Sequence, residues 1–385
     1  MTWDAVVIGA GPAGAVAARG LARSGCSVLL VDKAHFPRPK VCGCCVNGAA
    51  IQTLQRLGLG HVLAEGVPLR DVRIGAGRRT ATVPLPGGVA LSRDALDLAL
   101  VREAQRAGAE LREGVTAKFG APSLAGACGA GAPPAKAPGP HAPGAEIRLG
   151  AERVEARVAV VASGLAGSDT EPAPGSRVGA GAIVPAERVP DFFAPGTIFM
   201  ATGRGGYVGL VRVEDGRLDV AAAFDVAFVK ARGGLGAAAD AVLAGVGWPR
   251  APGLAELPWR GTPALTRRAR QLAGERWFAI GDAAGYVEPF TGEGMAWAAA
   301  AAAAVAPLAA RAVQRWDAAL AREWGRAYRR AVGERQGVCR AVARVLRSPL
   351  LTGAAVRALS AFPALSRPVV SRLNRRAPAP NGTPS

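Results

Sequence analysis

Three glycines near the start of the chain have the spacing of a phosphate-binding turn. Gly9, Gly11 and Gly14 form a G-x-G-x-x-G motif between an apolar run, residues 5–9, and an alanine-rich stretch, residues 12–25. In a strand–turn–helix unit the first glycine permits the tight turn, and the second lets a pyrophosphate approach the backbone. The third lets helix and strand pack closely, and free N–H groups at the helix N-terminus bind the phosphates.

An acidic residue stands where such a unit needs one. Asp32 ends the second apolar run, residues 26–32, and lies 18 residues after Gly14. A carboxylate at that place binds a ribose 2′-hydroxyl. The sequence therefore predicts a dinucleotide site made by Gly9, Ala10, Gly11, Pro12, Ala13, Gly14, Asp32 and Lys33.

A second glycine-rich segment lies far along the chain and bears on the kind of dinucleotide. Residues 277–298, "WFAIGDAAGYVEPFTGEGMAWA", predict a strand ending at Gly281-Asp282, then a loop, then a helix opening at Gly292-Glu293-Gly294. The acid can bind sugar-like hydroxyls, and a helix N-terminus can stabilise negative charge on a reduced ring. A simple NAD domain needs no such segment this far along the chain, so the segment favours FAD over NAD. Gly281, Asp282, Gly292, Glu293, Gly294 and Met295 are thus further candidates.

Three cysteines lie close together in "KVCGCCVNG", residues 40–48. A zinc site needs about four ligands, and no further Cys or His has a recognisable spacing from Cys42, Cys44 and Cys45. A disulfide between such close neighbours is strained. Small polarisable side chains packed under a cofactor and a working thiol both fit the pattern. These readings stay open, and no metal site is predicted.

Composition limits the partners and the compartment. The net charge is +18, but only five of the 47 basic residues are lysines, as a GC-rich genome produces without selection for binding. Fifteen arginines lie between residues 311 and 376, so the excess belongs mainly to the C-terminal tail, and nucleic acid is not an expected partner. Because the other cysteines are scattered and no signal peptide is recognised, we expect a cytoplasmic protein. Pro307 interrupts the longest apolar run, so we expect that run to form a buried core helix.

The elements predict an α/β chain built from discontinuous parts. A Rossmann-like, parallel-sheet FAD-binding domain is expected over residues 1–70, 91–170 and 270–310, with a mainly antiparallel β substrate domain over 71–90 and 171–269. Residues 120–145, rich in Gly, Ala and Pro, are expected to be a surface insertion. Basic helices over 311–376 and a disordered tail over 377–385 complete the chain.

With these motifs the chain resembles FAD-dependent oxidoreductases of the p-hydroxybenzoate hydroxylase type, in the branch of geranylgeranyl reductases and flavin halogenases, over residues 4–310. The resemblance implies that the first glycines and Asp32 hold the ADP half of FAD. It implies that Asp282 holds the ribityl chain or pyrophosphate, and that 292–295 lie by the flavin pyrimidine edge. Arg93 matches an arginine near the FAD phosphates, with a solvated arginine as the alternative. Cys42-Gly43 matches a Cys-Gly beside the flavin, so Cys42 is the catalytic candidate.

Departures from the family pattern leave the reaction open. Ser163-Gly164 replaces the Asp-Gly of the hydroxylases, only Tyr207 remains of the aromatic strand of the geranylgeranyl reductases, and the Trp-x-Trp-x-Ile-Pro run of tryptophan halogenases is absent. We expect a reductase or monooxygenase acting on a hydrophobic small molecule such as an isoprenoid, polyketide or phenolic. The alternative is a non-catalytic, flavin-carrying, membrane-associated binding protein.

The remaining expectations concern reductant and partners. A second dinucleotide motif is absent, so NAD(P)H would dock transiently or act through a separate reductase. The Arg-rich C-terminal helices either lie on the inner face of the membrane or pack on the catalytic domain with a solvated basic face. The sequence does not determine the substrate or the oligomeric state.

Overall fold

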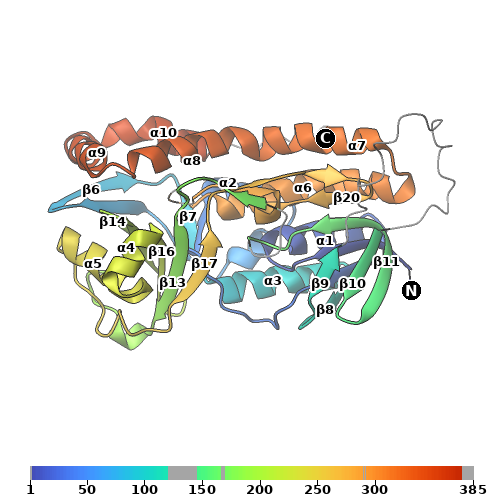
Figure 1. The fold of residues 1–385 in the computed structure, drawn as a ribbon, viewed down its shortest axis with the longest axis horizontal. Helices are drawn as coiled ribbons and strands as arrows, with labels where there is room; N and C mark the ends of the chain where they lie inside the picture. Colours follow the sequence, from blue (N-terminus) through green and yellow to red (C-terminus); the bar gives the residue numbers. More distant parts are fainter. Residues whose placement is uncertain (1, 120–144, 166–169, 289, 291, 375–385) are drawn as a thin grey trace.

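The first layer of the molecule is an eight-stranded sheet with a parallel centre. The computed structural model describes residues 2–119, 145–165, 170–288, 290 and 292–374 (Figure 1). The strand order is β19-β20-β11-β1-β2-β8, and β10 pairs with β11 and with β9. The strands are β1 (Thr2–Ile8), β2 (Val28–Val31), β8 (Glu110–Arg112), β9 (Ala117–Phe119), β10 (Ala145–Leu149), β11 (Glu152–Val161), β19 (Ala273–Gly274) and β20 (Trp277–Ala279).

This sheet contains the predicted nucleotide unit. β1 runs parallel to β2 and to β11, and β11 runs parallel to β20. α1 (Pro12–Arg23) connects β1 to β2, as the sequence predicts. The predicted insertion, except for Ala145, and the predicted disordered tail lie outside the described residues.

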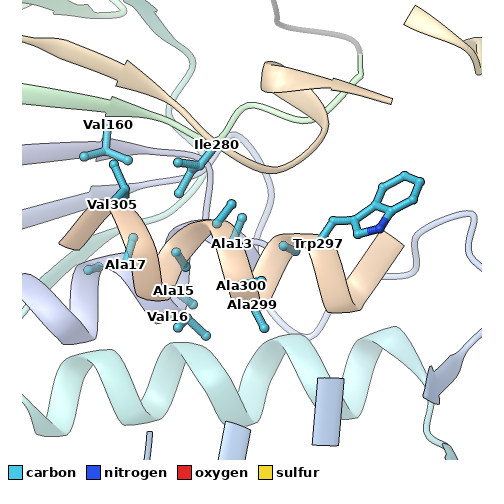
Figure 2. Close-up of a cluster of buried hydrophobic side chains, with 14 of the residues drawn as sticks. Ala13, Ala15, Val16, Ala17, Val160, Ile280, Trp297, Ala299, Ala300 and Val305 are labelled. Atoms are coloured by element: carbon cyan, nitrogen blue, oxygen red, sulfur yellow. The ribbon is translucent and has the colours of Figure 1, made fainter. Parts of the chain in front are cut away.

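Small residues let two helices lie close together on the sheet. α6 (Gly294–Gln314) packs against α1, and Figure 2 shows Ala13, Ala17, Ala300 and Val305 among the side chains of this cluster. A Cβ atom on Gly20 of α1 would come within 2.9 Å of the Ala306 Cβ atom. α2 (Gly48–Arg56) packs against α6, and α3 (Arg93–Arg106) packs against α1.

α6 is the one helix in the described part of the chain with the length and hydropathy to cross a membrane. However, 72% of its most apolar window is buried inside the fold. Its burial agrees with the core helix expected around Pro307.

The second layer is a seven-stranded sheet that is antiparallel apart from one pair. The order is β17-β13-β16-β15-β14-β5-β6, and only β14 and β5 run parallel. Its strands are β5 (Asp71–Ala76), β6 (Arg79–Pro84), β13 (Val178–Val184), β14 (Thr197–Gly203), β15 (Gly206–Arg212), β16 (Leu218–Phe224) and β17 (Arg260–Ala264). α4 (Val226–Arg232) and α5 (Leu235–Val246) lie beside it (Figure 1).

Two small sheets and short 3₁₀ turns connect the layers. One has the order β3-β7-β4 and the other β12-β18-β21. Their strands are β3 (Cys45–Asn47), β4 (Val67–Pro68), β7 (Gly88–Ala90), β12 (Thr170–Pro172), β18 (Arg267–Ala269) and β21 (Gly285–Tyr286). The turns are η1 (Gly60–Leu63), η2 (Ala186–Arg188) and η3 (Gly281–Ala284).

The C-terminal helices form a long layer over both sheets (Figure 1). They are α7 (Ala318–Tyr328), the π-helix η4 (Arg329–Gly333), α8 (Glu334–Val345), α9 (Pro349–Ala361), the 3₁₀ turn η5 (Pro363–Ser366) and α10 (Arg367–Leu373). Trp324 is fully buried, and its indole N–H donates to the Ala279 carbonyl, which ties α7 to the first sheet at 3.2 Å. At the other end α9 packs on β6 and β5.

Candidate functional site

One cavity of about 1490 Å³ runs from the glycine turn after β1 to the C-terminal helices. It brings together most of the residues predicted from sequence. The predicted residues in its wall are Gly9, Gly11, Pro12, Ala13, Asp32, Lys33, Cys42, Arg93, Gly281, Asp282, Gly292, Gly294 and Met295. Ala10, Gly14 and Glu293 are not in the wall, and each has a structural contact described below.

The glycine turn has the geometry that the motif requires. Gly9 has φ +102°, and a Cβ atom there would lie 2.3 Å from the Ala162 carbonyl oxygen. A Cβ atom on Gly14 would lie 1.8 Å from the Gly9 carbonyl oxygen, so only glycine lets α1 approach β1. Gly11 caps α1 without a side-chain hydrogen bond, which leaves the N–H groups of the first turn facing the cavity end.

Two arginines face this turn, beside two carboxylates. A Cβ atom on Gly11 would lie 3.7 Å from an Nη2 atom of both Arg38 and Arg93. Asp97 binds Arg93 through two hydrogen bonds of 2.7 and 2.8 Å, and Arg38 lies 3.5 Å from Asp97 and from Asp32. Arg93 is therefore buried and paired rather than solvated. A helix N-terminus with two held guanidinium groups forms a site for a diphosphate.

Asp32 lines the cavity and also accepts hydrogen bonds from the backbone. Its Oδ2 atom accepts from the Ala10 N–H at 2.8 Å, and its Oδ1 atom accepts from the Ala34 N–H at 2.9 Å. These bonds hold the glycine turn against the end of β2. They leave room for a further hydroxyl donor, because a carboxylate has about four acceptor positions.

Most residues of the second predicted motif line the cavity, but Glu293 is buried away from it and contacts other parts of the fold. Asp282 and Gly292 line the cavity, and a Cβ atom on Gly294 would lie 3.2 Å from the Tyr286 hydroxyl. Glu293 is fully buried away from the wall. It accepts from Asn47 at 2.5 Å and lies 3.7 Å from Arg335 of α8. Burial raises the pKa of Glu293 to about 7.

The three cysteines differ in their surroundings, and all are free thiols. All three belong to the cavity wall. Cys44 is the most buried, at 2% exposed, and has φ +49°, a strained value for a residue with a side chain. A Cβ atom on Gly292 would lie 3.8 Å from the Cys45 Cβ atom, so Cys45 faces the loop predicted beside the flavin. Among the described residues no group of three or more Cys, His, Asp or Glu side chains could hold a metal ion.

Cys42 belongs to a small charge cluster at the cavity wall. A hydrogen bond from the Cys44 thiol, helped by the nearby charge of Arg93 and opposed by burial, lowers the pKa of Cys42 to about 5. Its hydrogen bond to Cys42 raises the pKa of Cys44. Burial raises the pKa of Asp219 on β16, which lies beside Cys44 and has one unpartnered oxygen, Oδ2. At neutral pH the cluster thus holds a thiolate at Cys42 and a proton on Cys44, and the raised pKa of Asp219 favours the protonated form of its carboxyl group.

Beyond the cysteines the cavity becomes apolar. One side is the face of the second sheet, which contributes Val72, Ile74, Val83, Ile198 and Met200. The other side is the C-terminal layer, which contributes Val342, Val345, Ala355, Val356 and Leu359. We call this part the apolar arm. Tyr207 stands at its inner end, edge-to-face with Phe290 at a centroid distance of 5.0 Å.

Several wall residues escaped sequence reasoning. Lys40 and Arg38 precede the cysteines, and burial lowers the pKa of Lys40. Tyr286, also in the wall, comes from a segment far along the chain, and burial raises its pKa. Asp219 is not in the wall but lies beside Cys44, and it was missed as well. In the sequence, the basic residues and the cysteine of segment 38–42 could have indicated that the whole segment lies in the site. No sequence pattern around Asp219 indicated that it belongs to the site.

The wall fits FAD on grounds independent of any relative. The buried Ser163 Oγ and Arg38 Nε atoms face this region without a hydrogen-bond partner in the described chain. A diphosphate at the α1 N-terminus and sugar hydroxyls along Asp32, Ser163 and Asp282 would satisfy polar groups that otherwise stay buried and unpaired. Gly292–Met295 then hold the N-terminal end of α6 toward the ring.

Comparison with known proteins supports the same cofactor. A family described as an FAD binding domain matches residues 2–118. Menaquinone reductase of Mycobacterium tuberculosis is 39% identical over 120 residues, which are 30% of this chain and 29% of that protein. Digeranylgeranylglycerophospholipid reductase 1 of Methanopyrus kandleri is 37% identical over 116 residues, 29% of each protein. These alignments thus span under a third of either relative.

Solved structures extend the likeness to the whole fold. A geranylgeranyl bacteriochlorophyll reductase-like protein of Thermoplasma acidophilum has a TM-score of 0.74 at 19% identity and covers 97% of this chain and 95% of its own. A myxobacterial chondrochloren halogenase has a TM-score of 0.68 at 21% identity over 86% of this chain and 80% of its own. The fold class and the resemblance stated from sequence are confirmed.

Proposed function

We propose that this chain, whose fold is that of the FAD-dependent oxidoreductases, is a reductase of a hydrophobic small molecule with a long apolar tail. An isoprenoid quinone or isoprenoid lipid has this chemistry. The observation that carries the proposal is the continuity of one cavity from the glycine turn, past Cys42, into the apolar arm. The two relatives above are named as reductases of a quinone and of a prenylated lipid, which supports the same substrate class.

The protein groups would bind the cofactor, orient the substrate and supply a proton. Arg38, Arg93 and the α1 N-terminus hold the diphosphate, and Asp282 holds hydroxyls of the cofactor. When bound, FAD supplies the electron pair of the reduction. The apolar arm takes the tail by burial of apolar surface and excludes water from the reacting end.

Cys42 is the proposed catalytic residue. Cys42 lines the cavity, and Cys44 connects it to Asp219, a carboxyl group whose pKa is raised by burial. Reduction by two hydrogens needs two protons together with the electron pair. The bound cofactor would supply one of them with the pair, as a hydride, and the other would pass from Asp219 through Cys44 to Cys42 and on to the substrate. NAD(P)H as the source of those electrons remains part of the proposal. Enzyme names among the relatives and structures above favour this reading over a non-catalytic flavin carrier.

Oxygen-dependent halogenation or hydroxylation is the second candidate. The likeness to the halogenase favours it, since that structure covers most of the chain. Both candidates use the same FAD site. They differ in the product, which gains two hydrogens in one case and a halogen or oxygen in the other.

Binding as a function of tail length tests the substrate class. We expect affinity for a prenylated quinone in detergent solution to rise on the order of tenfold with each added isoprenoid unit until the arm is full. Val356 of α9 is 2% exposed and faces the arm, so Val356→Trp should abolish this gain while leaving short-tailed binding intact. Ala354→Trp on the exposed side of α9 is the matched control. Equal affinity for short and long tails in the wild type would refute the proposal.

A further inference from the structure

Exposed apolar side chains gather at one end of the C-terminal layer. Seven large hydrophobic side chains are exposed in the described part of the chain, and six of them lie between Val345 and Val369. Leu350 is 86% exposed, Phe362 66% and Leu351 57%. Single exposed hydrophobics are ordinary, but a cluster of this kind indicates an interaction surface.

The outward side of α9 is apolar where a solvated helix would be polar. Its exposed residues are Pro349, Leu350, Leu351, Ala354, Arg357, Ser360 and Ala361, of which only Arg357 is charged. Its inward side, with Val356 and Leu359, lines the apolar arm. The following turn, "FPALSRPVV" over residues 362–370, is almost wholly exposed. We call the exposed side of α9 together with residues 362–369 the docking face.

The charge around this face has one sign. Between residues 335 and 374 there are seven arginines and no Asp or Glu. Arg347 is directed inward to Glu288 and Asp225, whereas Arg357, Arg367 and Arg372 are exposed. Apolar side chains set among exposed arginines suit the boundary of a bilayer with anionic headgroups.

The docking face is continuous with the mouth of the cavity. Leu365 and Val369 are exposed to solvent and also belong to the cavity wall. The partly buried Ser366 and Val370 belong to the wall too. In Figure 1, α9 lies at the end of the layer farthest from the N-terminus, above β6. A molecule dissolved in a bilayer under this face would meet the opening of the apolar arm without crossing water.

We propose that the docking face, Leu350–Val369, binds an anionic lipid bilayer and opens the apolar arm to it. The inference deepens the proposed function. It rests on that function in one respect, because the docking face would be the entrance for an apolar-tailed substrate. A second copy of the chain is the competing occupant. It is less consistent with the arginines, which would face each other across a symmetric contact.

Vesicle binding by the holoprotein tests the docking face without any substrate. We expect cosedimentation with vesicles of phosphatidylcholine containing about a third phosphatidylglycerol, weakened by salt, and little binding to pure phosphatidylcholine. Leu350→Ser/Phe362→Ser and Arg357→Gln/Arg367→Gln should each lower the affinity at least about tenfold. Neither Leu350 nor Phe362 lines the cavity.

Matched controls separate docking from misfolding and from general charge. Val226→Ser removes a 46% exposed side chain on α4, and Arg315→Gln/Arg326→Gln removes the same charge near α7; both should bind like the wild type. All variants should keep their melting temperature and FAD content. Leu350→Ser/Phe362→Ser should raise KM for a substrate embedded in vesicles and leave KM for a short-tailed soluble one unchanged.

Three results would overturn the inference. These are absence of vesicle binding, equal loss in the control variants, and a dimer in light scattering that Leu350→Ser/Phe362→Ser dissociates. If the protein reduces detergent-dissolved substrate but ignores vesicles, the docking face fails alone. If it binds vesicles but reduces nothing, the proposed function fails and the docking face stands.

Discussion

Cys42 and Cys44 are neighbours in the loop before β3, yet they hold different protonation states. The Cys44 thiol donates to Cys42, which stabilises the thiolate there and keeps the proton on Cys44. Arg93, held by Asp97, adds positive charge on the same side. The functional thiol predicted from sequence thus has a physical basis in the residues around it, while its catalytic role stays a prediction.

Removing the Cys44 donor should raise the pKa of Cys42. We expect the alkylation rate of Cys42, followed by peptide mapping, to rise with pH around a midpoint of about 5 in the wild type. The midpoint should move upward in Cys44→Ala, because the thiolate loses its hydrogen bond, and stay unchanged in Cys45→Ala. A wild-type midpoint near the ordinary thiol value of about 8.5 would contradict this account.

Glu293 gives a pH dependence of stability with a definite sign. Burial raises its pKa from 4.5 to about 7, so between these values the folded protein keeps a proton that the unfolded chain has lost. The free energy of unfolding should therefore fall as pH rises through this window, by about 1.4 kcal/mol per pH unit from this group. Its contribution is fully favourable only below about pH 4.5.

Glu293→Gln isolates that contribution. The amide can still bind Asn47 and carries no charge to bury, so the variant should gain stability relative to the wild type as pH rises from 5 to 8. Urea unfolding at several pH values, with FAD content checked, measures the difference. A constant difference between the two proteins across this range would show that the pKa is not raised.

Local motifs predicted those residues of the cavity wall that lie at a turn or at the end of a strand. Gly9, Gly11, Asp32 and Asp282 could be found because a turn or a strand end explains each of them. Asp219 could not, since it meets Cys44 only after β16 joins a sheet with β15 and the cysteine loop packs on it. Contacts between distant segments leave no periodic trace in the sequence.

At the scale of elements, long strands and helices were predicted and short ones were not. The β1–α1–β2 unit, the hairpin of β5 and β6, and α3 all agree with their sequence patterns. The sheet of β3, β4 and β7 was missed, because strands of two or three residues are too short to show alternation. That sheet matters to the site, since β3 begins at Cys45.

The close approach of α1 to β1 should make Gly14 intolerant of a methyl group. Gly14→Ala places a Cβ atom 1.8 Å from the Gly9 carbonyl, so the turn must shift, and we expect at least about 1–3 kcal/mol lower stability together with weaker FAD binding. Gly245→Ala in α5 meets nothing within 4 Å and should stabilise by about 0.5–1 kcal/mol. Thermal unfolding of both variants checks the pair; wild-type FAD affinity in Gly14→Ala would remove the glycine turn from the site.

At the scale of the whole molecule, three parts of the chain enclose the cavity. The first sheet supplies the polar end, the second sheet one side of the apolar arm, and the C-terminal helices the other side. The sequence predicted these parts and their order but not that α9 closes the arm, because an Arg-rich amphipathic helix does not reveal which surface it covers. Under the proposed function, the arm closed in this way holds the tail of the substrate.

A single turnover under anaerobic conditions tests this account most directly. The FAD-loaded protein, reduced with dithionite and mixed with a long-tailed prenylated quinone, should regain the absorbance of oxidised flavin at a rate that rises with substrate concentration. Mass spectrometry should then find a product heavier by two hydrogens, formed in proportion to the enzyme. A reduced flavin that persists until oxygen is admitted, and a halogenated or hydroxylated product only then, would contradict it.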